Sequence, residues 1–165
     1  MNLKIKEITL SGIGVAIVFC GTYFIKIPNQ IDGYMNLGDG FILLFATILN
    51  PFLAFIVGGL GSALADLAGG YGHYFFFTLV VKGIEAVIVA YWCRKFPSFK
   101  IRIVGYILGS AVMVVGYFLT KWYLKSSLLI AISGIPGNLM QAVLGIIIVL
   151  LLAPLASKQA QKYFK

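Results

Sequence analysis

The chain has 165 residues, of which 61% are hydrophobic and 11% are charged, and it carries a formal net charge of +8. A mean hydropathy of +0.99 is far above that of a soluble domain, so the composition excludes an ordinary soluble globular protein and indicates one surrounded by lipid. The basic residues lie between and beyond the apolar stretches and form no basic stripe, which argues against a nucleic-acid-binding role.

Four apolar stretches, residues 8–25, 74–92, 103–123 and 132–152, are each close to the ~20 residues that cross a bilayer as a helix. The first stretch follows Lys4 and Lys6 but has no small-residue cleavage site after it, so we expect a transmembrane helix there and not a removed secretory signal. Residues 41–65 are ambiguous, because Asn50 and Pro51 divide them and the stretch reads either as one long span or as two shorter ones.

Short cytoplasmic loops carry an excess of Lys and Arg, and this rule decides between the two readings. If residues 41–65 cross once, the basic cluster at residues 94–102 lies opposite Lys4 and Lys6. If the stretch breaks before Pro51, nine of the 13 basic residues face the cytoplasm. These nine are Lys4, Lys6, Arg94, Lys95, Lys100, Arg102, Lys158, Lys162 and Lys165, whereas Lys26, Lys121 and Lys125 face outwards.

We therefore predict an all-α, polytopic membrane protein, in which residues 1–165 form one domain built as a bundle of six transmembrane helices. Both termini are expected in the cytoplasm. The second helix is expected to be short, covering residues 39–50. Pro51 then lies in the first turn of the third helix, where its missing N–H costs nothing.

The polar residues of this topology gather toward the outer half of the bundle. Asp39 and His73 fall near the outer surface, and Lys82 and Glu85 enter the fourth helix from the same side. Charges within a span normally face the bundle interior and mark a site, and the i, i+3 spacing lets Lys82 and Glu85 neutralise each other. We expect a binding wall here, with a purely structural ion pair as the alternative.

Asn138 and Gln141 have the same i, i+3 spacing at the outer end of the sixth helix, after the helix-breaking residues 134–137. Their amides offer donors and acceptors for an uncharged ring or a hydroxyl-rich ligand, and interhelical hydrogen bonds are the alternative. For Asp39, a helix cap and a ligand contact both remain open. His73 lies in an aromatic segment typical of a membrane-interface belt, with ligand contact as its second reading.

Motifs for catalysis and for energy conversion are missing from the sequence. It contains no G-x-x-x-x-G-K-[ST], H-E-x-x-H or G-x-S-x-G motif. Cys20 and Cys93 lie inside apolar runs without metal-ligand spacing. We therefore expect no enzyme activity, no cofactor and no metal site, and any ATP-driven transport must depend on another protein's ATPase.

Four segments together give the chain a family resemblance that covers nearly its whole length. They are residues 34–39 (YMNLGD), 58–67 (GGLGSALADL), 78–85 (TLVVKGIE) and 136–141 (PGNLMQ). The chain resembles the substrate-specificity (S) subunits of energy-coupling factor (ECF) vitamin transporters, and most of all those of the hydroxymethylpyrimidine and pyridoxine group.

This resemblance implies a bacterial plasma-membrane protein that binds a vitamin from outside with high affinity and topples when it docks on a shared module. That module comprises a transmembrane coupling protein (EcfT) and two ATPases. The docking positions would be Gly12, Ala16 and Cys20, where the family more typically has alanines. The vitamin pocket would fall on the segment 34–39 with Asn36 and Asp39, on Lys82 with Glu85, and on Asn138 with Gln141.

Three alternatives remain open at this stage. A stand-alone secondary transporter would use Glu85 or Asp66 as its proton-coupling group, although broken midplane helices and repeats are not evident. An S subunit for another vitamin, such as the acidic pantothenate, would need Lys82 to be freed from Glu85. A structural or assembly protein is the third, and the charges within the span argue against it.

Overall fold

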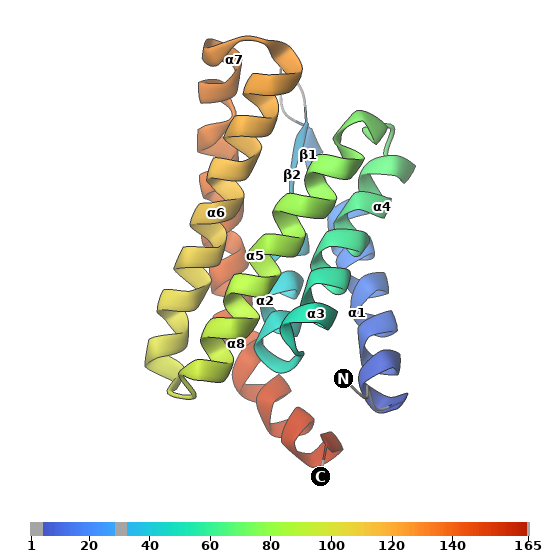
Figure 1. Ribbon diagram of the computed structural model, residues 1–165, viewed down its shortest axis with the longest axis vertical. Helices are drawn as coiled ribbons and strands as arrows, with labels where there is room; N and C mark the ends of the chain where they lie inside the picture. The colour runs from blue at the N-terminus through green and yellow to red at the C-terminus, as the bar shows by residue number, and fades with distance from the viewer. Residues whose placement is uncertain (1–4, 29–32, 165) are drawn as a thin grey trace.

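The computed structural model describes residues 5–28 and 33–164, with side chains through residue 155. The expectations for Lys4, Lys158, Lys162 and Lys165 therefore lie outside the described side chains. Within the described residues, five helical segments are long and apolar enough to span a membrane, and a sixth apolar helix has 11 residues. The predicted all-α bundle of six helices, including its short second member, is confirmed (Figure 1).

The chain order of the elements is simple, and α5 lies at the centre, where it packs against α2, α3, α4 and α6. The first elements are α1 (Ile5–Tyr23), β1 (Lys26–Pro28), β2 (Tyr34–Asn36) and α2 (Gly38–Ile48). The third span consists of α3 (Pro51–Phe55), the π-helix η1 (Ile56–Leu60) and α4 (Gly61–Ala68). After them come the 3-10 turn η2 (Gly72–Tyr74), α5 (Phe75–Lys95), α6 (Phe99–Lys125), α7 (Leu128–Ser133) and α8 (Ile135–Phe164).

The break between the second and third spans has a local cause. Asn50 has an extended backbone, and its side chain accepts a hydrogen bond of 3.0 Å from the backbone N–H of Leu53. Pro51 occupies the first turn of α3, where a proline loses no helical hydrogen bond. The cap and the proline together end one helix and start the next, so the predicted break is confirmed.

The third span contains a π-helix that the sequence analysis did not predict. It contains Gly58 and Gly59, and their α-carbons face the backbone of α5. A Cβ on Gly59 would lie 2.5 Å from the carbonyl oxygen of Leu79. Glycine is therefore required here, because only a backbone without side chains allows the two helices this approach.

Two features at the other end of the bundle differ from the predicted helices. Strands β1 and β2 pair antiparallel, with Lys26 opposite Asn36 and Pro28 opposite Tyr34, and we call this pair the hairpin. The predicted helix at 132–152 is also longer and divided, since α7 ends at Ser133 and α8 starts at Ile135. Pro136 lies inside the first turn of α8, where proline is tolerated, so the break falls at Gly134 and not across residues 134–137.

The two ends of the bundle differ in content. Both termini and the α5–α6 connection lie at one end, which we call the terminal end (Figure 1). The hairpin, η2 and α7 lie at the other, which we call the hairpin end (Figure 1). A cluster of buried apolar residues joins α1, α2, α3, η1, α5, α6 and α8, and it includes Leu43, Leu53, Val89, Tyr106 and Val149.

Candidate functional site

A cavity of about 620 Å³, open mouth included, lies at the hairpin end. Five elements contribute most of the lining. They supply Tyr34, Met35 and Asn36 from β2, Ser62 and Asp66 from α4, Thr78 and Lys82 from α5, Tyr117 and Lys121 from α6, and Gly137, Asn138 and Gln141 from α8.

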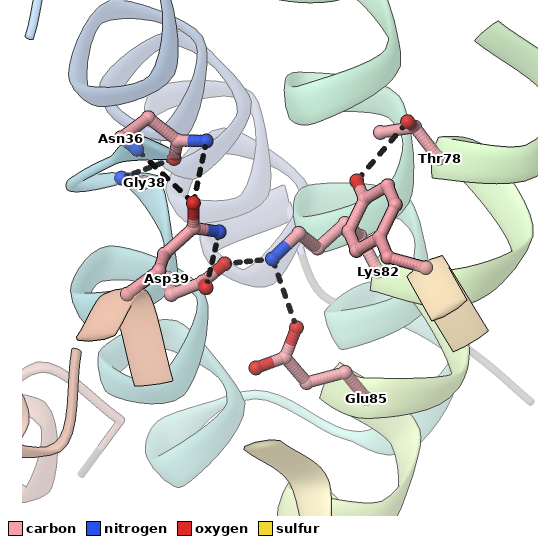
Figure 2. Close-up of polar contacts among 8 residues, drawn as sticks. Asn36, Gly38, Asp39, Thr78, Lys82 and Glu85 are labelled. Atoms are coloured by element: carbon pink, nitrogen blue, oxygen red, sulfur yellow. Dashed lines mark hydrogen bonds and ion pairs between the residues drawn. The ribbon is translucent and has the colours of Figure 1, made fainter. Parts of the chain in front are cut away.

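A charged cluster forms the floor of this cavity, and Figure 2 shows Lys82 between two carboxylates. Lys82 Nζ donates a hydrogen bond to Asp39 Oδ1, and it lies 3.4 Å from Glu85 Oε2. Asp39 and Glu85 are 0% exposed and Lys82 is 1% exposed. Opposite charges buried at this depth are stable only as partners, so the predicted pairing of Lys82 with Glu85 is confirmed and Asp39 is its third member.

A chain of hydrogen bonds connects this cluster to the hairpin. Gln141 Nε2 donates to Asp39 Oδ2 at 2.7 Å, and Gln141 Oε1 accepts from the backbone N–H of Asn36 at 3.0 Å. The side-chain amide of Asn36 also donates to Gln141 Oε1, at 3.3 Å. Gln141 on α8 therefore connects β2 with α2, because its single amide group bonds both Asn36 and Asp39.

The start of α2 explains why Asp39 takes this position. Asn36 Oδ1 accepts a hydrogen bond of 2.9 Å from the backbone N–H of Gly38 (Figure 2), an Asx-type turn that leads into the helix. Gly38 lies so close to Thr22 of α1 that a side chain at position 38 would collide with its hydroxyl. Asp39 then falls in the first turn of α2, where the helix dipole stabilises a carboxylate.

The walls of the cavity are aromatic with polar edges. Tyr34 donates its hydroxyl to Asp66 Oδ1 at 2.6 Å, and its ring packs against Tyr71 with 4.9 Å between centroids. Burial, and then the negative charge of Asp66, raise the pKa of Tyr34 above its usual range. Its phenol therefore remains a hydrogen-bond donor at neutral pH. On the opposite wall, the Tyr117 hydroxyl donates to Thr78 Oγ1 at 3.1 Å.

The predicted binding residues fall into three groups. Asn36, Asn138 and Gln141 line the cavity together with Lys82. Asp39 and Glu85 lie outside the described lining and contact Lys82 from below. His73 is exposed on η2, where its ring lies 4.6 Å from that of Tyr74, and it is not among the described lining residues.

Several lining residues were not predicted, although the sequence contains a signal for them. Three polar pairs with i, i+4 spacing face the cavity: Ser62 with Asp66, Thr78 with Lys82, and Tyr117 with Lys121. Such pairs share one face of a helix, so polar residues at this spacing inside an apolar span indicate an interior face. The hydroxyls of Ser62 and Thr22 are buried and have no hydrogen-bond partner among the described residues, so they are open to a bound ligand.

The positions predicted for docking lie on the outer surface of α1. Gly12, Ala16 and Cys20 are all exposed, and a Cβ on Gly12 would meet no atom within 4 Å. The opposite face of the same helix packs inward, since a Cβ on Gly14 would lie 3.0 Å from Val57. The small residues at positions 12, 16 and 20 therefore form an exposed strip on α1 that faces away from the bundle.

Metal-ligating side chains do not gather in this site. The described residues contain no group of three or more His, Cys, Asp or Glu side chains able to hold a metal ion. The groups that the cavity offers are a carboxylate, amides, hydroxyls, amines and aromatic rings. Such a set recognises a small ring with polar substituents through hydrogen bonds and stacking.

Comparisons with known proteins agree with this geometry. A family model described as the S component of an ECF-type riboflavin transporter matches residues 2–158. The thiamine precursor transporter HmpT of Lactococcus lactis subsp. cremoris (strain MG1363) is 30% identical over 161 residues, which cover 95% of this chain and 91% of that protein. An uncharacterized protein of Pyrococcus woesei is 38% identical over 128 residues, covering 77% of this chain and 85% of that protein.

A solved structure, that of the S component of a bacterial ECF transporter, has the same fold. It matches with a TM-score of 0.75 and 21% identity, over 93% of this chain and 97% of that one. The family is one of transporter components and not of enzymes, and its members are multi-pass membrane proteins. With the family model covering nearly all residues, the chain belongs to the S components of ECF-type transporters.

Proposed function

We propose that this S component captures a small heteroaromatic vitamin or vitamin precursor, of the hydroxymethylpyrimidine or pyridoxine class, at the hairpin end. The observation that supports it best is the composition of the cavity. Aromatic rings of Tyr34, Tyr71 and Tyr117 flank a space whose polar groups are amides, hydroxyls and the carboxylate of Asp66. A pyrimidine or pyridine ring stacks on such walls, while its nitrogens, amino group and hydroxymethyl group exchange hydrogen bonds with the edges.

The depth of the cavity supports high affinity. A nanomolar ligand needs ~12 kcal/mol of binding free energy, and for about a dozen heavy atoms this is near the ceiling of ~1.5 kcal/mol per atom. Such efficiency requires a ligand enclosed on nearly all sides. Asn36, Asp66, Lys82 and Gln141 come from four different elements around the space, so a ligand of this size would meet protein on several sides.

The direction of capture follows from charge. Arg94, Lys95, Lys100 and Arg102 lie at the terminal end, around the α5–α6 connection. Because basic residues favour the cytoplasmic side, this end faces the cytoplasm of the plasma membrane and the hairpin end faces outwards. Below the charged cluster the described interior is packed mainly with apolar side chains, which supports release by reorientation of the whole subunit.

Reorientation would depend on partners. Within the proposal, the exposed strip formed by Gly12, Ala16 and Cys20 docks on a transmembrane coupling protein (EcfT). Two ATPases bound to that protein supply the energy. Small residues allow a close approach of two helices in lipid, and these three are exposed on α1. The subunit then topples and presents its ligand to the cytoplasm. ATP is hydrolysed by the partners, since this chain has no P-loop motif.

Two experiments test the proposal. Native mass spectrometry of the purified chain should show one co-purified small molecule, and calorimetric titration should then rank hydroxymethylpyrimidine, pyridoxine, riboflavin and pantothenate. We expect one of the first two to bind most tightly. If riboflavin, which the family model names, or pantothenate bound most tightly, the proposed ligand class would be wrong and that vitamin would take its place. If none of the four bound, the proposal would be rejected.

The second experiment separates an ECF subunit from a stand-alone proton-coupled carrier. Vesicles containing the chain alone should bind ligand and should not accumulate it under a proton gradient. Accumulation should require the coupling protein, both ATPases and ATP. Uptake by the chain alone would support the secondary-carrier alternative.

A further inference from the structure

The carboxylates in and below the cavity differ in their partners. Among the described residues, the charged groups that line the cavity or join its floor comprise the carboxylates of Asp39, Asp66 and Glu85 and the amines of Lys82 and Lys121. Lys82 pairs with Asp39 and Glu85 on the floor. Asp66 has no part in these two ion pairs, and a buried carboxylate is costly unless a partner compensates it.

The direct contacts of the nearest amine are with the floor. Lys82 Nζ bonds Asp39 and lies 3.4 Å from Glu85, so its charge acts on Asp66 only from a distance. Lys121 Nζ lies near the end of α7, where it would be 2.9 Å from a Cβ on Gly134. Asp66, in the upper part of the cavity, is therefore placed to contact a bound ligand directly.

Asp66 uses one carboxylate oxygen in a hydrogen bond and keeps the other available. Its Oδ1 accepts the Tyr34 hydroxyl at 2.6 Å, a well-formed O–H···O hydrogen bond. Its Oδ2 is buried and accepts no well-formed hydrogen bond within the described part of the chain, and Thr78 is the neighbour able to turn a hydroxyl toward it. Asp66 itself is 94% buried, being 6% exposed, and it lines the cavity.

Resting on the proposed function, we propose that the cavity takes its heteroaromatic ligand as a cation, protonated on a ring nitrogen, with Asp66 as the counter-ion. The ring N–H donates to Asp66 Oδ2, while Tyr34 holds Oδ1 and fixes the orientation of the carboxylate. The ligand brings its proton from the outside solution, and no bond of the ring is made or broken. Tyrosine faces around the site favour a cation further, because an aromatic face attracts positive charge.

The proposal predicts how affinity depends on pH. Above the pKa of the ligand's ring nitrogen, the binding-competent cation becomes ten times rarer for each pH unit, so the apparent Kd should rise tenfold per unit. The pH at which the apparent Kd begins to rise should depend on the ligand. For hydroxymethylpyrimidine and pyridoxine it should differ by the difference between their ring pKa values. The titratable and charged groups that face Asp66 or share its cavity are Tyr34, Tyr71, His73, Lys82, Tyr117 and Lys121. If one of these titrated instead, the onset would be the same for both ligands.

Calorimetric titration of the purified full chain between about pH 5 and pH 9 tests this with both ligands. Asp66→Asn should remove the pH dependence and weaken binding at the acid end at least tenfold. Glu7→Gln, the same chemical change in the first turn of α1, should behave as the unaltered protein. A ligand analogue with carbon in place of the ring nitrogen should bind the unaltered protein at least a hundredfold more weakly, which tests the idea even if Asp66→Asn does not fold.

Each outcome has a distinct meaning. Tight binding that is independent of pH, or an onset shared by both ligands, overturns the cation proposal and leaves the vitamin-capture proposal standing. Equal affinity for the carbon analogue also overturns it. The absence of binding by any heteroaromatic ligand at any pH rejects the proposed function itself.

Discussion

The hairpin end and the terminal end of the bundle are built from the same helices but are held together in different ways. At the hairpin end, α2, α5, α8 and β2 meet through Asp39, Lys82, Gln141 and Asn36, and the space above them is open. Toward the terminal end, side chains such as Leu43, Leu53 and Val89 fill the interior. In the proposed function, the membrane-embedded polar groups serve a binding site, while apolar packing supplies its base.

In a lipid bilayer, hydrogen bonds and charges determine how helices associate more specifically than apolar contacts do. Lipid is as apolar as the interior, so burying a leucine in the bundle gains little over leaving it in the bilayer, and helices associate through packing and polar contacts instead. Replacing polar residues at the hairpin end should therefore lower ligand affinity, and replacing the buried charges should also lower stability. Replacements in the packed half should act through volume alone.

The largest effect is expected from Lys82→Met. It leaves the buried carboxylates of Asp39 and Glu85 without their counter-charge, a loss of about 3–5 kcal/mol in a buried ion pair. We expect a markedly lower Tm in detergent and a lower yield of folded protein. The triple change Lys82→Met, Asp39→Asn, Glu85→Gln, which removes all the charges, should recover most of the Tm. If the triple variant is no more stable than the single one, the charge explanation is wrong.

A second effect tests the packing of η1 against α5. Gly59→Ala places a Cβ 2.5 Å from the Leu79 carbonyl oxygen, and overpacking of this kind costs about 1–3 kcal/mol. The clash is with backbone, so α5 itself must shift. Gly12→Ala is the matched control, since nothing lies within 4 Å of that position, and its Tm should equal or exceed that of the unaltered protein. Equal Tm values for the two variants would contradict the described contact between η1 and α5.

A third effect is on binding. Gln141→Ala removes the amide that connects Asn36 to Asp39, and we expect ligand affinity to fall at least tenfold, or ~1.4 kcal/mol. Folding should be retained, because interhelical hydrogen bonds in membrane proteins contribute only ~0.6 kcal/mol on average. Calorimetric titration measures the affinity, and Asn138→Ala on the same cavity wall provides the comparison. Unchanged affinity in both variants would refute the role of this wall.

The smallest effect concerns the turn after α6. Ser126 has φ +49°, a left-handed backbone conformation, which costs a residue with a side chain about 1–2 kcal/mol. Ser126→Gly should relieve the strain and raise the Tm slightly, with ligand affinity unchanged. A lower Tm would indicate that the serine side chain makes a stabilising interaction that offsets the strain of its backbone conformation.

The sequence allowed much of the fold to be predicted because its signals are local. The Asn50–Pro51 break follows from a cap and a proline, and the charges Lys82 and Glu85 stand out inside an apolar span. The hairpin was missed because strands of three residues are too short to show a periodic pattern. The π-helix was missed for a similar reason, since it depends on how two helices approach each other.

The site was predicted only in part, because its geometry depends on long-range contacts. The bond between Lys82 and Asp39 joins residues 43 positions apart, and that between Gln141 and Asp39 joins residues 102 positions apart. Neither spacing leaves a trace in sequence. Thr78 and Tyr117 were overlooked because single hydroxyl groups are common in apolar helices, whereas their i, i+4 relation to Lys82 and Lys121 would have revealed them.

The central claim is that the cavity opens to the outside and the packed half faces the cytoplasm. Two exposed serines at opposite ends of α6, Ser98 and Ser126, allow a direct test. In a chain with Cys20 and Cys93 replaced by alanine, Ser126→Cys should react with a membrane-impermeant maleimide in intact cells, and Ser98→Cys should react only after permeabilisation. Labelling of Ser98→Cys but not Ser126→Cys in intact cells would contradict the account.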